Sequence, residues 1–199
     1  MTKSVLRYLS HPQVQINPDV EITEWSLNDV GRARIDALAA VAQDRLDGTV
    51  AVFSSPERKA CDAAEPIAAA LDLSVQIAPD SYENDRSSTG YLPSAEFEKT
   101  ADIFFGKPEE SVRGWERAVD AQTRILRSVK GVLRDAPAGD VLIVGHGAVG
   151  TLLFCAIKGY PITRTYDQGP GGGGNLLMFD RETLEINSEW QSLESHFLL

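Results

Sequence analysis

The 199-residue sequence predicts an α/β protein, a three-layer α/β/α sandwich with a mostly parallel central sheet. Short apolar segments typical of buried strands alternate with helical patterns, which favours parallel strands covered by helices on both faces. A hydrophobic content of 43% and a charged content of 24% are ordinary for a globular protein. No internal repeat or long linker divides the chain, so residues 1–199 are expected to form one domain.

The first half of the chain predicts three strands and two helices. The first strand runs through "VLRYLS" and stops before Pro12, because proline cannot donate a hydrogen bond to a β-ladder. Two further strands are bounded by glycine or proline, and the helices between them are rich in alanine and leucine. The ranges are 48–56 and 73–79 for these strands, and 27–46 and 57–72 for the helices.

The second half begins with an irregular stretch, residues 80–110, which contains a short helical piece around Phe97–Phe105. Residues 111–133 give the clearest helix, because apolar side chains recur there at intervals of three and four. Residues 140–157 predict a buried strand, a tight glycine turn and a helix. A glycine-rich loop at 169–174 then leads into a final hairpin over 175–190.

Charge and cysteine content narrow the classes of function. The formal net charge of −10 argues against a nucleic-acid partner, which normally requires a basic face. An anionic small substrate stays compatible, because salt screens the global field over roughly 8 Å. No apolar run approaches the roughly 20 residues of a membrane span, and no signal-peptide pattern opens the chain. Cys61 and Cys155 lie in apolar helical patterns, which predicts reduced core thiols and a cytoplasmic location.

Two of the three histidines follow predicted strands. His11 comes after "VLRYLS" and His146 comes after "VLIVG". The carboxyl ends of parallel strands meet at one edge of a sheet, where ligands bind, so these two side chains are expected to share a crevice. Gly145 and Gly147 suit a turn that passes close to a ligand, and the amides that open the following helix suit an anion. His196, in the polar tail, is expected to be structural.

These motifs resemble, in order, those of the histidine phosphatase superfamily, which includes the phosphoglycerate mutases. The family opens with a strand ending in Arg-His-Gly, and the aligned triplet here is Ser10-His11-Pro12. The resemblance covers nearly the whole chain. Its other matching positions are Asn17, the helix start Leu27–Gly31, the segment "SSPERKACDAAEPIA", Glu83, the pair Glu110-Ser111, and the turn "VLIVGHGAVGTLL".

Two positions depart from the family pattern. Ser10 stands where the family has arginine, and Lys59 stands where a second arginine precedes alanine. Arg7 lies too far back along the strand to replace the first arginine, and Arg58 points about 100° away from Lys59 at the helix start. Arginine holds phosphate with a planar fork whereas lysine offers a point charge, so the predicted pocket binds phosphate with fewer contacts. Arg86, three residues after Glu83, could restore a cation.

The resemblance implies a phosphoglycerate mutase-like phosphatase that hydrolyses a small phosphate monoester. It implies His11 as the nucleophile that becomes a phosphohistidine, Glu83 as the acid and base, and His146 as a catalytic group that stabilises phosphoryl charge. The implied substrate-binding residues are Ser10, Asn17, Arg58, Lys59, Arg86 and Gly147. No cofactor or metal is implied. The expected partner is a small phosphorylated molecule, with a second copy of the chain as a candidate partner for a homodimer.

Four alternatives stay open. A catalytically weak or inactive member of the same fold would bind phosphorylated ligands without turning them over, as the changes at Ser10 and Lys59 suggest. Mutase activity would need a pocket that retains a dephosphorylated intermediate, and a pure interaction module would leave the strand-end histidines unexplained. His11, His146 and Glu83 could instead form a zinc site. The run "GPGGGG" could be a flap or an anion-binding nest, but it lacks the ending of a P-loop.

Overall fold

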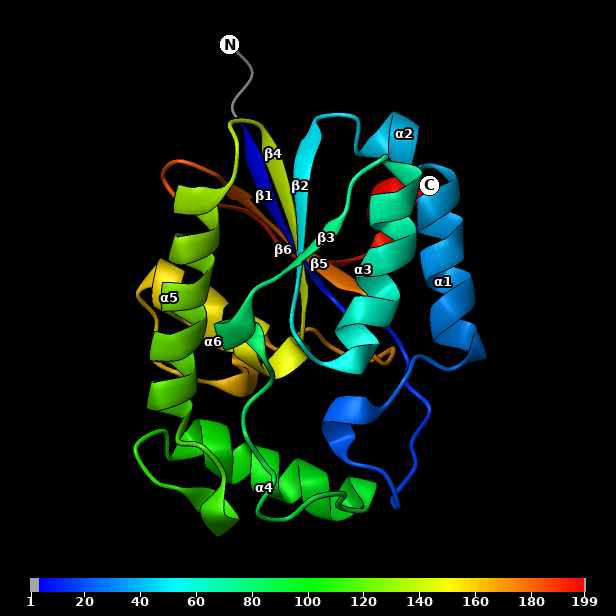
Figure 1. Ribbon diagram of the computed structural model, residues 1–199. Coiled ribbons are helices and arrows are strands. Elements are labelled where there is room, and N and C mark those ends of the chain that lie inside the picture. Colours follow the sequence, from blue (N-terminus) through cyan, green and yellow to red (C-terminus); the bar gives the residue numbers. More distant parts are fainter. Residues whose placement is uncertain (1–3, 199) are drawn as a thin grey trace.

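A computed structural model describes residues 4–198, so the predicted domain limits at residues 1 and 199 lie outside the described residues. A six-stranded sheet forms the centre of the molecule (Figure 1), in the order β3-β2-β4-β1-β5-β6. The bounds are β1 Val5–Ser10, β2 Thr49–Ser54, β3 Val75–Ile77, β4 Asp140–Gly145, β5 Asn175–Asp180 and β6 Ile186–Ser192. Neighbouring strands from β3 to β1 are parallel, and β5 is antiparallel to both β1 and β6. The predicted mostly parallel sheet is confirmed.

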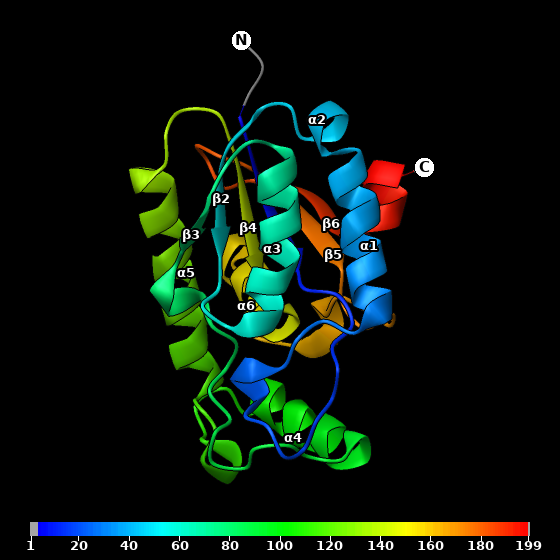
Figure 2. The same cartoon turned by 45° about the vertical axis from the view of Figure 1, so that its right-hand side comes forward.

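Helices cover both faces of the sheet (Figures 1 and 2). On one face lie α1 (Asp29–Ala40), α2 (Ala42–Arg45) and α3 (Arg58–Ala70); on the other lie α5 (Ala118–Asp135) and α6 (Gly147–Lys158). Successive strand residues serve opposite faces, as the pleat requires. In β1, Leu9 packs in the core beneath α1 and α3, whereas Leu6 and Tyr8 pack in the core beneath α5 and α6. The predicted three-layer α/β/α arrangement is therefore confirmed.

Two predicted helices differ from the structure. The expected helix 27–46 is divided at Val41, whose φ of −113° and ψ of 5° depart from helical geometry. The expected helix 111–133 begins only at Ala118, because Arg113 has a φ of 52° and Trp115 is extended. Trp115 leaves the helix to reach the core, where its Nε1 donates to Thr89 Oγ1 at 2.9 Å. The apolar spacing there reflects packing against the core without an α-helix, since residues 112–114 form a 3-10 turn.

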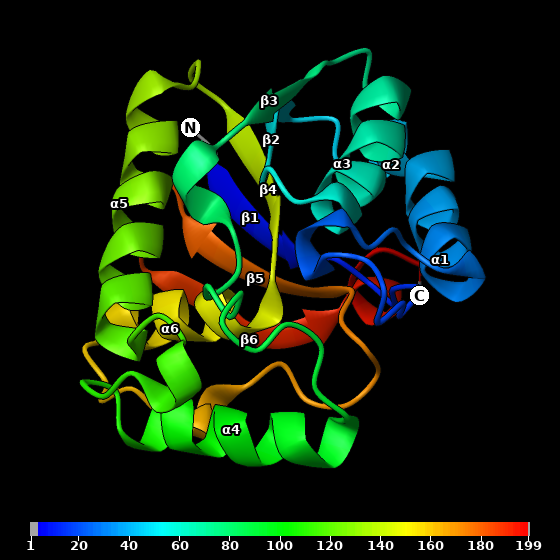
Figure 3. The same ribbon diagram turned by 60° about the horizontal axis from the view of Figure 1, so that its bottom comes forward.

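The register of the sheet positions the two histidines. Ser10 of β1 pairs with Gly145 of β4, so His11 and His146 follow paired strand ends. The backbone N–H of His11 also donates to the carbonyl of Gly145 at 2.9 Å. Figure 3 turns this end of the sheet forward, and α4 (Ser94–Gly106) and its neighbouring loops lie beyond the strand ends. Within residues 4–198, no helix is long and apolar enough to cross a membrane.

Candidate active site

The two strand-end histidines lie against each other. Their ring centroids are 5.2 Å apart and their planes meet at 76°. Nδ1 of His11 lies 2.8 Å from the carbonyl oxygen of Pro12. Because a carbonyl oxygen only accepts hydrogen bonds, Nδ1 carries the ring proton and Nε2 keeps its lone pair. Burial, then the neighbouring imidazole of His146 and the charge of Lys59, lower the pKa of His11 to about 3, so the ring is neutral at physiological pH. His11 is therefore a neutral imidazole with Nε2 free to react.

His146 is held more tightly than His11. Its side chain is fully buried, and its Nε2 lies 2.7 Å from the hydroxyl oxygen of Ser55. Burial and the positive charge of Lys59 hold its pKa well below the usual range. Its Nδ1 is buried and has no hydrogen-bond partner among the described residues. The ring is thus a neutral group with one unused nitrogen.

Tyr8 fixes the backbone of His146 and was not predicted as a site residue. Its buried hydroxyl accepts from the N–H of His146 and donates to the carbonyl of the same residue, both at 3.0 Å. Burial raises the pKa of Tyr8, so this hydroxyl stays protonated. Sequence alone showed Tyr8 only as a core residue of the first strand. Its polar end belongs to the site.

Tyr8→Phe is expected to lower the free energy of unfolding by roughly 1–3 kcal/mol, because it leaves the buried N–H of His146 without a partner and removes one of the two hydrogen bonds to the carbonyl of His146. Urea unfolding measures the effect. Tyr160→Phe is the control, since Tyr160 is exposed. Equal unfolding midpoints for the two variants would contradict a bridging role for the Tyr8 hydroxyl.

Glu83 caps the start of α6. Its carboxylate accepts from the backbone N–H groups of Val149 at 3.1 Å, of Ala148 at 3.3 Å and of Asn84 at 3.1 Å. The helix amides that the sequence assigned to an external anion are thus occupied by this side chain. Burial, and then the negative charge of Glu57, raise the pKa of Glu83 above its usual value. A carboxyl with a raised pKa is suited to giving up a proton near neutral pH.

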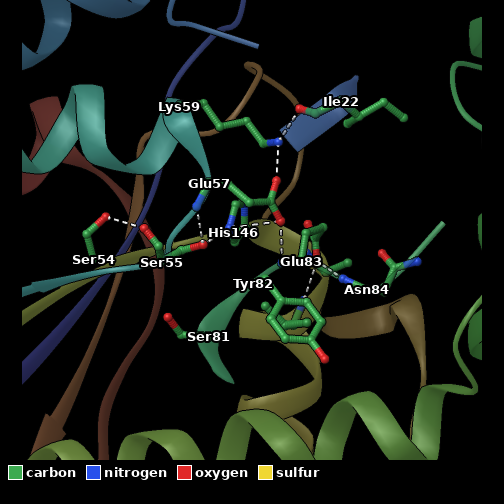
Figure 4. A network of polar contacts seen from close by, with 12 residues as sticks. Ile22, Ser54, Ser55, Glu57, Lys59, Ser81, Tyr82, Glu83, Asn84 and His146 are labelled. Carbon is green, nitrogen blue, oxygen red and sulfur yellow. Dashed lines mark hydrogen bonds and ion pairs between the residues drawn. The ribbon is translucent and has the colours of Figure 1, made fainter. Parts of the chain in front are cut away.

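Glu57 is a second buried carboxylate at the same end of the sheet, and sequence analysis gave it no role (Figure 4). One oxygen pairs with Nζ of Lys59, and the other accepts from the N–H of Glu83 at 2.7 Å and lies 3.6 Å from Nε2 of His146. Nζ of Lys59 also donates to the carbonyl of Ile22 at 2.8 Å. The sequence signal that could have identified Glu57 is its position directly before α3, the helix that carries Lys59.

Ser10 bonds to a distant loop and to the start of β5. Its fully buried hydroxyl donates to Oε1 of Gln168 at 2.5 Å and accepts from the N–H of Asn175 at 3.0 Å. A Cβ on Gly147 would lie 2.1 Å from Nε2 of Gln168, so this amide packs directly on the start of α6. An uncharged side chain from a distant loop therefore occupies the space beside Ser10.

The glycine-rich loop passes over the backbone of His11. Gly173 has a φ of +86°, and a Cβ there would lie 2.1 Å from the His11 carbonyl oxygen, so the close approach requires glycine. The next N–H, from Gly174, donates to that oxygen at 3.1 Å. Arg34 donates to the carbonyl of Gly173 at 2.9 Å and pairs with Glu194. These contacts fasten the loop beside His11.

Two predicted binding residues, Asn17 and Arg58, lie away from the histidines, and a third, Arg86, lies at the edge of the site. Asn17 is exposed, and its side chain accepts from the N–H of Asp19 at 3.0 Å. Arg58 is exposed and pairs with Asp62 at 2.7 Å, whereas its neighbour Lys59 is buried. Arg86 lies over the ring of Phe97, 4.9 Å from its centroid. The structure therefore brings Lys59 to the histidines and does not bring Asn17 or Arg58 there.

A cavity of about 390 Å³ adjoins the site and is lined by Glu57 and Glu83 together with Arg86. Four of its lining residues are acidic, namely Glu21, Glu57, Glu83 and Asp85. Within the described residues, no group of three or more histidine, cysteine, aspartate or glutamate side chains is arranged to hold a metal ion. The site thus combines a neutral imidazole with an unprotonated Nε2, a second buried imidazole, a carboxyl with a raised pKa and one lysine.

The sequence model described as histidine phosphatase superfamily (branch 1) matches residues 10–186. No curated protein sequence gives a significant match. Among solved structures, Bacillus stearothermophilus YhfR superposes with a TM-score of 0.75 at 19% identity, covering 97% of this chain and 98% of that one.

Two phosphatases of known substrate share the fold. Mycobacterial glucosyl-3-phosphoglycerate phosphatase superposes with a TM-score of 0.69 at 20% identity, covering 94% of this chain and 96% of that one. A phosphoserine phosphatase variant from Entamoeba histolytica, in complex with phosphoserine, gives a TM-score of 0.71 at 17% identity, covering 98% and 99%. At these identities the likeness establishes the fold and leaves the substrate open.

Proposed function

We propose, because the chain belongs to the histidine phosphatase superfamily, that it hydrolyses a small phosphate monoester through a phosphohistidine on His11. The observation that carries this proposal is the state of His11: its Nδ1 proton is held by the Pro12 carbonyl, and Nε2 is unprotonated beside His146. A neutral imidazole avoids most of the charge repulsion that a phosphate ester presents to an anionic nucleophile. The phosphatases that share the fold support this reaction class.

The reaction takes two displacements. In the first, Nε2 of His11 forms a bond to phosphorus while the bond to the ester oxygen breaks, and Glu83 gives its proton to that oxygen. In the second, water attacks phosphorus, Glu83 takes the water proton, and Nε2 of His11 leaves. His146 and Lys59 stabilise charge on the phosphoryl oxygens.

The alternative function is a phospho-ligand-binding protein with weak or no turnover. It is favoured by the arrangement of the two positions that depart from the family pattern. The hydroxyl of Ser10 is engaged by Gln168, and Lys59 is paired with Glu57, so the pocket offers a phosphate little unpaired positive charge. Weak binding of phosphate lowers transition-state stabilisation as well, because the same contacts serve both.

A phosphate-release screen over a panel of phosphorylated metabolites tests the proposal. Purified wild-type protein is expected to release phosphate from at least one ester, and His11→Ala is expected to release none. Protein that binds phosphorylated ligands, measured by calorimetry, but hydrolyses none of the panel would favour the alternative.

Activity is expected to survive EDTA, because in this mechanism the nucleophile, the acid and the phosphoryl contacts are all side chains. The same screen, run with and without chelator, measures this. Loss of activity in EDTA that zinc restores would instead favour the zinc-site alternative.

A further inference from the structure

We infer that Glu57 is an internal ligand of the phosphoryl-binding site, whose carboxylate occupies the place of the substrate's phosphoryl group until that group displaces it. The inference rests on the proposed function for the identity of the site. It concerns how anions enter that site and which residue limits their binding.

The groups around Glu57 are those that bind anions. Its two oxygens meet the ammonium of Lys59, the backbone N–H of Glu83 at 2.7 Å, and Nε2 of His146 at 3.6 Å. A cation and a backbone amide form a donor set suited to a phosphoryl group, and the imidazole of His146, bonded to Ser55, lies beside them. Figure 4 shows the carboxylate between Lys59 and Glu83, with His146 beside it. In this structure the anion bound by these groups is the carboxylate of Glu57.

The site is also closed to other anions in this arrangement. His146 has no exposed surface, and the side chains of Glu57 and Lys59 are each 5% exposed. The adjoining cavity of about 390 Å³ reaches Glu57 and Glu83, but neither His11 nor His146 lines it. A phosphate ester entering from this cavity meets the Glu57 carboxylate before it meets an imidazole. Glu57 must therefore move before Nζ of Lys59 and the N–H of Glu83 can meet a phosphoryl group.

Displacement of Glu57 would open the site in a single movement. It would free the Nζ of Lys59, the N–H of Glu83 and the face of His146 for the phosphoryl oxygens. While Glu57 stays in place, its negative charge repels an incoming phosphate and neutralises the lysine. Glu57 therefore sets the affinity of the pocket, in addition to the changes at Ser10 and Lys59.

The test is the affinity of inorganic phosphate and orthovanadate for Glu57→Gln, measured by isothermal titration calorimetry. Removing one negative charge within contact distance of the bound anion is expected to tighten binding by at least about tenfold. Glu65→Gln is the matched control, because it makes the same change at an exposed position of the same helix, α3. Its affinity should equal that of the wild type. Unchanged or weaker binding by Glu57→Gln would overturn the inference.

A double variant keeps the test decisive if Glu57→Gln does not fold with Lys59 left unpaired. Glu57→Leu with Lys59→Met replaces a buried ion pair by apolar side chains, an exchange that folded proteins often tolerate. If Glu57 occupies the site, the double variant binds vanadate at least as tightly as wild type, although it has lost a cation. If the pair is purely structural, vanadate binding falls, and the inference fails.

The vanadate-binding measurements and the turnover measurements test the two proposals independently. Wild-type protein that hydrolyses no ester, together with tighter vanadate binding by Glu57→Gln, would sink the proposed hydrolysis and keep the internal ligand. Turnover abolished by His11→Ala, together with unchanged vanadate binding by Glu57→Gln, would keep the hydrolysis and sink the internal ligand.

Discussion

His11→Ala is expected to lower kcat for phosphate release by at least about a thousandfold, because no other imidazole can replace Nε2 of His11 as the nucleophile. The Nε2 of His146 is bonded to Ser55, and its remaining nitrogen, Nδ1, is buried, so neither is exposed to a phosphate ester. The fold should persist, since His11 follows the last residue of β1 and belongs to neither hydrophobic core. Phosphate release and far-UV circular dichroism measure the two effects.

His196→Ala is the control for this variant. His196 lies in the C-terminal tail, where its Nδ1 is 3.2 Å from Oε1 of Gln191, and it should leave kcat unchanged. A phosphohistidine should also be seen by ³¹P NMR in wild-type protein and be missing in His11→Ala. More than about a tenth of wild-type turnover in His11→Ala would contradict the nucleophilic role.

The sheet and its layers could be predicted because they follow from local patterns. Alternating strands and helices favour parallel strands, and once β1 and β4 pair, the pleat and register place His11 beside His146. Residues 111–117 could not be predicted in the same way. Their apolar spacing continues that of α5, but it carries no sign that Arg113 adopts a positive φ. The spacing of Val112 and Trp115 predicted correctly that both side chains pack against the core, but it predicted the wrong backbone conformation.

The direction of a side chain could be predicted where it depends on near neighbours along a helix. Adjacent side chains at a helix start diverge by about 100°, and Lys59 is buried where Arg58 is exposed. The burial and pairing of a side chain could not be predicted where its partners come from distant segments of the chain. The burial of Glu57 depends on the carbonyl of Ile22, which holds Lys59, and on the N–H of Glu83. Neither contact can be read from the sequence around Glu57.

The two departures from the family pattern acquire a physical meaning only in the structure. Ser10 leaves room that Gln168 fills, and the amide of Gln168 packs on the start of α6, where Gly147 has no Cβ. Lys59 keeps a cation in place, but Glu57 pairs with it. Ser10 carries no charge and the charge of Lys59 is paired, and in both cases the partner lies outside the motif positions matched to the family. The motifs therefore locate the site but do not give its charge.

Glu83→Gln is expected to lower kcat/KM for an alkyl phosphate by roughly 10²–10⁴-fold, because the leaving oxygen then receives no proton. The loss should be much smaller for p-nitrophenyl phosphate, whose leaving group departs as a stable anion. Asp85→Asn, at an exposed position two residues away, is the control and should leave the ratio of the two substrates unchanged. Equal losses on both substrates would contradict the role of Glu83 as the acid.

The pH dependence tests the same role in the wild-type protein. Phosphorylation needs Glu83 protonated and His11 neutral. Burial and the charge of Glu57 raise the pKa of Glu83, so the rate on an alkyl phosphate should fall as pH rises through that raised pKa. The pKa of His11, lowered to about 3, places the acidic limb below the range in which Glu83 loses its proton. Glu83→Gln should remove the fall at higher pH, and Glu57→Gln should shift it to lower pH, because Glu57 is one of the two main causes of the raised pKa. A fall that persists unchanged in Glu83→Gln would assign the proton to another group.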